Sequence, residues 1–314
     1  MPPQTKKHFG GSHIALTIDT NGYAQTSFLK AAEGGMIKAA TTEEPAAGFN
    51  LRGRHASTRE VDPLSLEFGM AGSKWALAIV HAIINNRIHD KVNGEVIHAD
   101  TNFVAQYSYE FTDALITEIG FPKLDAKAKE IAHLKLKLQP ESIDFAIGQG
   151  EKLVPGSALK QKGWLCSAFK LTIGDDVMAS SIEPLTVKIG AKAYQTGGFM
   201  LPQYTPTGKL DMPKFSFTVP MGYADAMLAW FRAAITTHQG LTDGSPVGGG
   251  QFEKDAIIEF LDPTRKKTLY TINLLGIGPE TCSVVKGDDS STRAMKFDCY
   301  VTNIKVEATG EGFI

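Results

Sequence analysis

The fold is decided by Phe215-Ser216-Phe217-Thr218-Val219 and by the helical stretch that follows it. Apolar and polar side chains alternate over the first segment, which predicts a half-buried β-strand. The period then changes, because apolar residues stand at positions i, i+3, i+4, i+7 and i+11 of one helix face; these are Ala224, Met227, Leu228, Phe231 and Ile235. The stretch therefore predicts a strand followed directly by an amphipathic helix that packs on the sheet.

The same strand and helix occur once before in the chain. Leu64-Ser65-Leu66-Glu67-Phe68 alternates in the same way, and Ser73 is suited to cap a helix that starts after it. Its apolar stripe consists of Trp75, Ile79, Val80, Ile83 and Ile84. A strand–helix pair is thus predicted in each half of the chain.

The segments around each pair also follow one order. In the first half we expect a strand at 14–18 with an Asn21-Gly22 turn, a loop at 33–62, a hairpin over 103–121 that turns at Thr112-Asp113-Ala114, Pro122 as its end, and a closing strand at 131–138. In the second half we expect strands at 169–173 and 185–189, a loop at 195–212, a hairpin over 257–275 that turns at Asp262-Pro263-Thr264, Pro279 as its end, and a closing strand at 295–301. Local identity between the halves is low, so what repeats is the plan of the fold.

This order predicts a mainly β (α+β) fold of two tandem β-barrel or sandwich units, each with one amphipathic helix. A small sheet with a single helix must close or pair with another sheet to bury its apolar face. Gly and Pro interrupt the pattern at 148–156. We therefore expect one domain over residues 1–150 and a second over residues 151–314.

Composition limits the function classes. The chain has 314 residues, 43% hydrophobic and 21% charged, with a formal net charge of −2, so it can bury a core and has no basic footprint for nucleic acid. Cys166, Cys282 and Cys299 form no CxxC pair, which favours a reducing compartment, and Cys299 alternates with apolar residues as a core residue would. No signal-peptide pattern or membrane-spanning run is visible, so we expect no membrane association.

Catalytic motifs are absent from the sequence: it holds no GxSxG, P-loop, HExxH or dinucleotide fingerprint. The best metal candidate groups His89 and Asp90 with His98 and Asp100, but their polar surroundings favour a solvated loop. Gly248-Gly249-Gly250 lacks the Lys of a phosphate loop and is interpreted as a flexible loop.

The remaining chemistry-bearing residues also have structural interpretations. Trp75 and Trp230 fall in helices and are expected to pack in the core. Glu118 and Asp113 flank the predicted hairpin without forming an acid–base pair, His133 is expected on a strand surface, and His238 lies near a helix end. No catalytic, cofactor-binding or metal-binding residue is therefore predicted, and we expect no enzyme activity and no cofactor.

One stretch resembles a known family. Pro122-Lys123-Leu124-Asp125-Ala126, Glu130, the alternating strand at 131–138 and Glu141 resemble the C-terminal end of contractile phage tail-tube proteins. In that family a strand ends in Pro, a Leu-Asp-Ala-like turn follows, and a closing strand completes the sheet. The second half has the same order around Trp230, although Thr281-Cys282-Ser283 replaces the Leu-Asp-Ala turn. Common tail-tube subunits hold one such domain, whereas here two weak copies cover most of the chain.

The resemblance implies a structural subunit of the inner tube of a contractile phage tail or phage-like injection system. Such subunits assemble into stacked rings, here a hexamer or a trimeric pseudo-hexamer. Sheath and baseplate proteins would be its partners, and DNA or effector protein would pass through the lumen without specific binding. We expect polar strand faces, such as Gln106, Ser108, Glu110 and Thr117, to line that lumen, and the long loops to reach neighbouring rings. The expected location is the virion tail, assembled in the host cytoplasm.

Three alternatives remain open. The first is a tube-initiator or baseplate-hub protein of the same machinery. The second is a metal-dependent hydrolase or isomerase on a β-barrel scaffold that uses His89, Asp90, His98 and Asp100. The third is a capsid or baseplate binding module that never polymerises.

Overall fold

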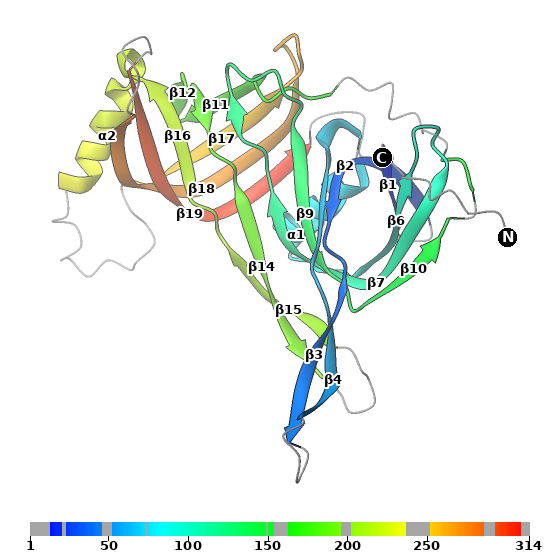
Figure 1. The fold of residues 1–314 in the computed structure, drawn as a ribbon. Helices are drawn as coiled ribbons and strands as arrows, with labels where there is room; N and C mark the ends of the chain where they lie inside the picture. Colours follow the sequence, from blue (N-terminus) through cyan, green and yellow to red (C-terminus); the bar gives the residue numbers. More distant parts are fainter. Residues whose placement is uncertain are drawn as a thin grey trace.

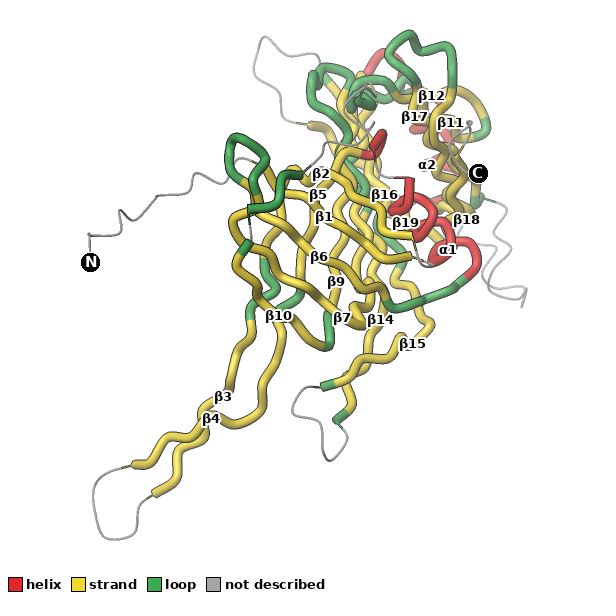
Figure 2. Tube along the Cα trace, turned by 90° about the vertical axis from the view of Figure 1, so that its right-hand side faces the viewer, coloured by secondary structure: helices red, strands yellow, loops and turns green. Residues whose placement is uncertain are grey.

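The protein consists of two β-rich units that lie side by side, with two long hairpins extending from the same end (Figure 1). The computed structural model describes residues 13–20, 23–45, 52–72, 74–148, 150–153, 163–195, 202–236, 252–285 and 293–308. Figure 2, turned by 90°, shows both hairpins again pointing away from the sheets in one direction. The mainly β fold is confirmed, and the described residues of each unit include one α-helix.

The first unit is a closed barrel of six strands in the order β1-β2-β5-β9-β7-β6, closed by the pairing of β6 with β1. All its neighbouring strands are antiparallel. The bounds are β1 His13–Thr20, β2 Tyr23–Glu33, β5 Leu64–Gly69, a 3-10 turn Met70–Gly72, α1 Lys74–Asn86, β6 Val92–Ala99, β7 Ala105–Gly120, β8 Leu124–Asp125, β9 His133–Gln139 and β10 Ser142–Ile147.

The second unit follows the same path. Four strand pairings of the second unit correspond to pairings of the first: β11–β17 to β1–β6, β17–β18 to β6–β7, β18–β19 to β7–β9, and β19–β16 to β9–β5. The short strands β12 and β13 together take the place of β2. The bounds are β11 Phe169–Ile173, β12 Asp175–Val177, β13 Ser181–Ile182, β16 Phe215–Pro220, a 3-10 turn Met221–Tyr223, α2 Asp225–Thr236, β17 Lys254–Leu261, β18 Thr268–Val285 and β19 Ala294–Ala308. The repeated plan expected from sequence is therefore present in the strand pairings.

The two hairpins are the arms of the molecule. The first arm, β3 Ile37–Pro45 with β4 Arg52–Val61, forms a two-stranded sheet of its own. The second arm, β14 Thr186–Tyr194 with β15 Gln203–Asp211, stands at the corresponding point of the second unit. The prediction of loops at 33–62 and 195–212 was wrong, because polar strands that face water on both sides carry no apolar alternation.

The predicted hairpin over 103–121 was also wrong, because β7 is one continuous strand. Asp113 has a φ of +50°, which bends the chain, but Thr112 pairs with Ser142 and Ala114 pairs with Val92 on either side of it. Pro279 likewise does not end a strand: it lies inside β18 at a bulge, where the pairing with β19 shifts by one residue. Four predictions lie outside the described residues: the turn at Asn21-Gly22, the loop at Gly248-Gly249-Gly250, the Ser73 cap and the position of His238.

The core is built from the alternating strands that the sequence predicted. Leu134, Leu136 and Leu138 of β9 are buried, and Phe217 stacks between Phe215 and Phe297 at ring distances of 5.1 and 5.4 Å. Trp75 and Trp230 are buried, and their indole N–H groups donate to the Ser27 hydroxyl at 2.9 Å and the Phe252 carbonyl at 2.7 Å. Cys299 is buried as predicted.

Gly94 tests the packing of the first barrel. It lies on β6 opposite Ile18 and Phe111, and a Cβ there would lie 2.7 Å both from the Phe111 ring and from the Thr17 carbonyl oxygen. We expect Gly94→Ala to lower the free energy of unfolding by about 1–3 kcal/mol in urea denaturation, because the strand or ring must move. Gly69→Ala is the matched control, since nothing lies within 4 Å of a Cβ there. Equal effects of the two variants would contradict this packing.

Candidate functional site

The candidate functional site is the contact between the two units, where each unit completes a sheet of the other. β14 of the second unit adds to the edge of β7, with Thr186 opposite Gly120, Val187 opposite Ile119 and Lys188 opposite Glu118. The Phe121 N–H extends this ladder by donating to the Leu185 carbonyl at 2.8 Å. The second arm is therefore anchored by backbone hydrogen bonds on the first barrel.

Glu141 fixes the other strand of that arm. One carboxylate oxygen, Oε1, accepts from the Lys91 ammonium at 2.5 Å and from the Tyr204 N–H of β15 at 2.9 Å. The Glu141 side chain is mostly buried, so this charge-assisted contact is less screened than a surface ion pair. It holds β15 beside the first unit.

The Leu-Asp-Ala motif makes the reciprocal contact. Leu124 and Asp125 form the short strand β8, which pairs with Ile182 and Ser181 of β13 in the second unit. The Ala126 N–H donates to the Ser180 carbonyl at 2.9 Å. The residues expected to form a turn therefore serve as an edge strand of the other unit.

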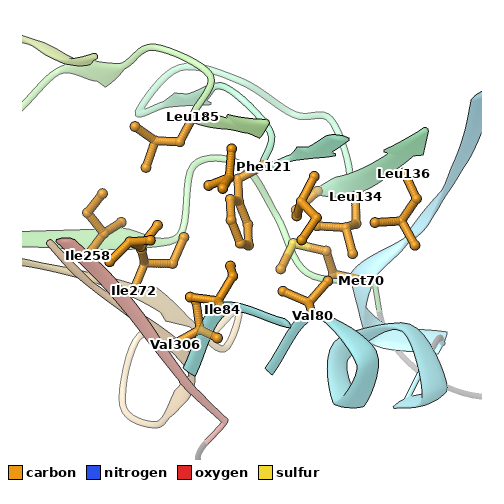
Figure 3. Close-up of a cluster of buried hydrophobic side chains, with 14 of the residues drawn as sticks. Met70, Val80, Ile84, Phe121, Leu134, Leu136, Leu185, Ile258, Ile272 and Val306 are labelled. Carbon is orange, nitrogen blue, oxygen red and sulfur yellow. The ribbon is translucent and has the colours of Figure 1, made fainter. Parts of the chain in front are cut away.

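Helix α1 seals the contact against β19. The Asn85 side-chain amide donates to the Val306 carbonyl at 2.6 Å, and its oxygen accepts from the Val306 N–H at 2.9 Å. Figure 3 shows Ile84 beside Val306, with Phe121 and Leu185 close by. These side chains belong to one buried cluster that runs through both units, so the contact resembles a continuous core.

The predicted metal candidates do not form a site. Asp100 caps the turn after β6 by accepting the N–H groups of Asn102 and Val104 at 2.8 and 2.9 Å. His98 stacks on Tyr107 at 4.4 Å, and burial lowers the pKa of its imidazole. Burial, with Arg87 nearby, also lowers the pKa of His89. Within the described ranges no three His, Cys, Asp or Glu side chains are grouped as metal ligands would be.

The other singled-out residues are likewise separate. Asp113 is exposed at the bend of β7, and Glu118 lies in the ladder with β14. His133 is half-buried on β9, and burial is the main cause that lowers its pKa. Of the face expected to line a lumen, Ser108 is buried, Gln106 and Thr117 are half-buried, and only Glu110 is exposed.

Sequence reasoning missed Asn85 and quoted Glu141 only within the family motif. A polar residue at a helix end and a carboxylate after Pro140 are both common on protein surfaces. Their partners, Val306 and Tyr204, are distant in sequence, so no local pattern identifies them.

Comparisons with known proteins give matches in structure only: no protein-family model and no curated protein matches the sequence. A chain of the anti-feeding prophage baseplate has 13% identity, with 46% of this chain and 99% of that chain covered at a TM-score of 0.40. A chain of the PVC sheath–tube complex, an extracellular contractile injection system, has 13% identity, coverages of 45% and 88%, and a TM-score of 0.33. Hcp1 from Flavobacterium johnsoniae has 12% identity, coverages of 45% and 95%, and a TM-score of 0.28.

The matching structures thus include chains of a prophage baseplate and of a sheath–tube complex, each aligned over less than half of this chain. None of the described helices is both long and apolar enough to cross a membrane.

Asn85 offers a test of the contact. In Asn85→Ala the Val306 N–H and C=O lose their side-chain partner in a buried setting, so we expect the free energy of unfolding to fall by about 1–3 kcal/mol. Hydrogen exchange at the Val306 amide should become faster. Asn86→Ala, at the exposed next position, is the control and should leave both measurements nearly unchanged. Equal exchange at Val306 in the two variants would contradict this role of Asn85.

Proposed function

We propose that this chain is a structural subunit of the inner tube of a contractile phage tail or phage-like injection system, without enzymatic activity. The observation that carries the proposal is the contact between its units, in which β14 of one unit completes the edge of β7 in the other. The two surfaces in this contact differ, so it is a head-to-tail contact. Repeated contacts of this kind generate closed rings or open helices.

The paired units support a ring with six-fold pseudo-symmetry. We propose domains over residues 1–150 and 151–314 that exchange elements, since β14 and β15 join the first sheet and β8 joins the second. Three such chains would supply six units, whereas six chains would be needed if only one unit lined the lumen.

The arms support stacking of rings. Both leave the units in the same direction (Figures 1 and 2), where the next ring would lie. The strands of the first arm are joined by a backbone ladder, and an exposed ion pair between Arg54 and Glu43 at 2.8 Å spans it. We propose that sheath and baseplate proteins bind the outside of the stack.

A conduit also suits the charge of the chain. A net charge of −2 gives no strong field to hold DNA or an acidic or basic effector, so cargo could slide through. We propose that the protein acts in the tail of a virion or related particle, after assembly in the cytoplasm of the host cell.

Negative-stain electron microscopy of the purified full chain at high concentration tests this function. We expect rings or hollow stacks, and rotational averages should show three-fold or pseudo-six-fold symmetry. A single ring that never stacks would favour the tube-initiator or hub role instead. A chain that stays monomeric at every concentration would overturn the proposal.

A further inference from the structure

We propose that the contact between the two units is repeated between chains, so that β18 of one chain accepts the first arm of the next. The acceptor edge is Thr281, Cys282 and Ser283 of β18, and the donor segment is Met36 together with Ile37 and Lys38, the first two residues of β3. This inference rests on the proposed function and names its assembly surfaces.

The acceptor edge follows from the strand registers. The pairing of β7 with β9 shifts by one residue between Ile116 and Glu118, and the pairing of β18 with β19 shifts in the same way between Pro279 and Thr281. Just beyond each shift, Ile119 stands opposite Leu136 and Cys282 stands opposite Phe297. Cys282 is therefore the counterpart of Ile119, the residue on which β14 docks.

The donor segment follows from the arms. In the first arm Lys38 pairs with Glu60, and in the second arm Lys188 pairs with Asp211. Glu60 precedes the start of β5 by the same number of residues as Asp211 precedes the start of β16. Lys38 is therefore the counterpart of Lys188, and Ile37 is the counterpart of Val187. Because Val187 lies opposite Ile119 inside the chain, Ile37 is placed opposite Cys282 between chains.

Neither surface pairs with a second strand within the described part of one chain. Among the described residues, 281–283 pair with β19 alone and β3 pairs with β4 alone. Val187 is fully buried, whereas its counterpart Ile37 is 46% exposed. Phe121 is 3% exposed, whereas its counterpart on β18, Val284, is 58% exposed. Unpaired apolar edges of this kind are sites for strand addition.

A second contact points to the same neighbour. Leu138 pairs with the first residue of β5, and Cys299 pairs with the first residue of β16, so these two residues are counterparts. Phe145 on β10 follows Leu138 by the same number of residues as Val306 on β19 follows Cys299. Phe145 is therefore the counterpart of Val306. Val306 is buried against α1, whereas Phe145 is 54% exposed. On the helix side, Met70 is buried and its counterpart Met221 is exposed. The neighbouring α2 would therefore cover Phe145.

The occupant is a second copy of this chain. Within one chain the two units make one contact between an arm and a strand edge. The acceptor edge on β18 and the donor segment at β3 remain unused. These complementary surfaces lie on different units, so chains can join only head to tail.

Cysteine cross-linking tests the register. In Ile37→Cys the new thiol should form a disulfide with native Cys282 of the next chain under mild oxidation, since opposite Cβ atoms in antiparallel strands lie about 4.5–5.5 Å apart, close to disulfide reach. Cys166 and Cys299 are buried and should not react. We expect a ladder of oligomers on non-reducing gels and a 37–282 peptide by mass spectrometry.

Two variants control this experiment. Thr41→Cys places an exposed thiol farther along the same strand, about 13 Å away at roughly 3.3 Å per residue, and should not cross-link to Cys282. Adding Cys282→Ser to Ile37→Cys should abolish the ladder. Rings in the microscope without a 37–282 bond would overturn this interface and leave the tube function standing. A monomer without cross-links would overturn both.

A pair of blocking variants tests the polarity of the contact. Ile37→Asp should block the donor segment and Val284→Asp should block the acceptor edge, because forming the contact would bury a carboxylate and remove its hydration. Each variant alone should stay monomeric, with an unchanged melting temperature because both positions are exposed. A mixture should form a 1:1 dimer by light scattering, through the intact surface on each chain. Thr41→Asp should still assemble, and a mixture that stays monomeric would contradict the proposal.

Discussion

The structure depends on the unpaired edges of its strands. A strand at the end of a sheet carries N–H and C=O groups that need partners, and an apolar edge invites other chains. The first unit closes most of its edges by forming a barrel, but the C-terminal part of β7 extends past β6. β14 covers that part of β7, and β8 covers β13 in return. The two units are therefore joined by the same kind of backbone hydrogen bonds that close the first barrel.

The contact also explains why the core is continuous. Strand addition brings Leu185 close to Phe121, and Val80 and Ile84 of α1 lie in the same buried cluster (Figure 3). Val187 also belongs to this cluster. Burying a large side chain contributes about 1.5–3 kcal/mol, which outweighs the modest net contribution of a few added backbone hydrogen bonds. Backbone pairing thus sets the register, and apolar packing supplies most of the stability of the contact.

Sequence patterns predicted the parts of the fold that have one solvent-exposed face and one buried face. The alternation at 64–68, 169–173 and 215–219 and the helix stripes gave the right elements, since burial on one side imposes a period on the residues. The arms gave no such signal, because strands such as β15 expose both faces. The sequence predicted a turn at Thr112-Asp113-Ala114, and Asp113 does have the left-handed backbone that is typical of turns, but pairing on both sides of it makes β7 continuous.

The contact between units was beyond sequence reasoning for a related reason. Glu141 and Asn85 look like surface residues until the fold brings Tyr204 and Val306 to them. The repeated plan, by contrast, was visible despite the low identity between the halves, because it depends on the order of elements alone. The Leu-Asp-Ala stretch carried a family resemblance, although its role here, pairing with β13, follows only from the strand register.

Joining two units in one chain changes how such an assembly would form. The contact inside the chain forms at the high effective concentration that a short linker provides, so it needs no encounter between molecules. Only the contacts between chains then depend on protein concentration, and each of them can be weaker than the contact inside a chain. The counterpart surfaces agree with this division: Val284 and Cys282 replace the larger Phe121 and Ile119, so the open edge exposes less apolar area than an exact copy would. In the proposed assembly, a smaller apolar edge would lower the tendency of the free chain to aggregate, while the unpaired backbone groups would still favour pairing with the next chain.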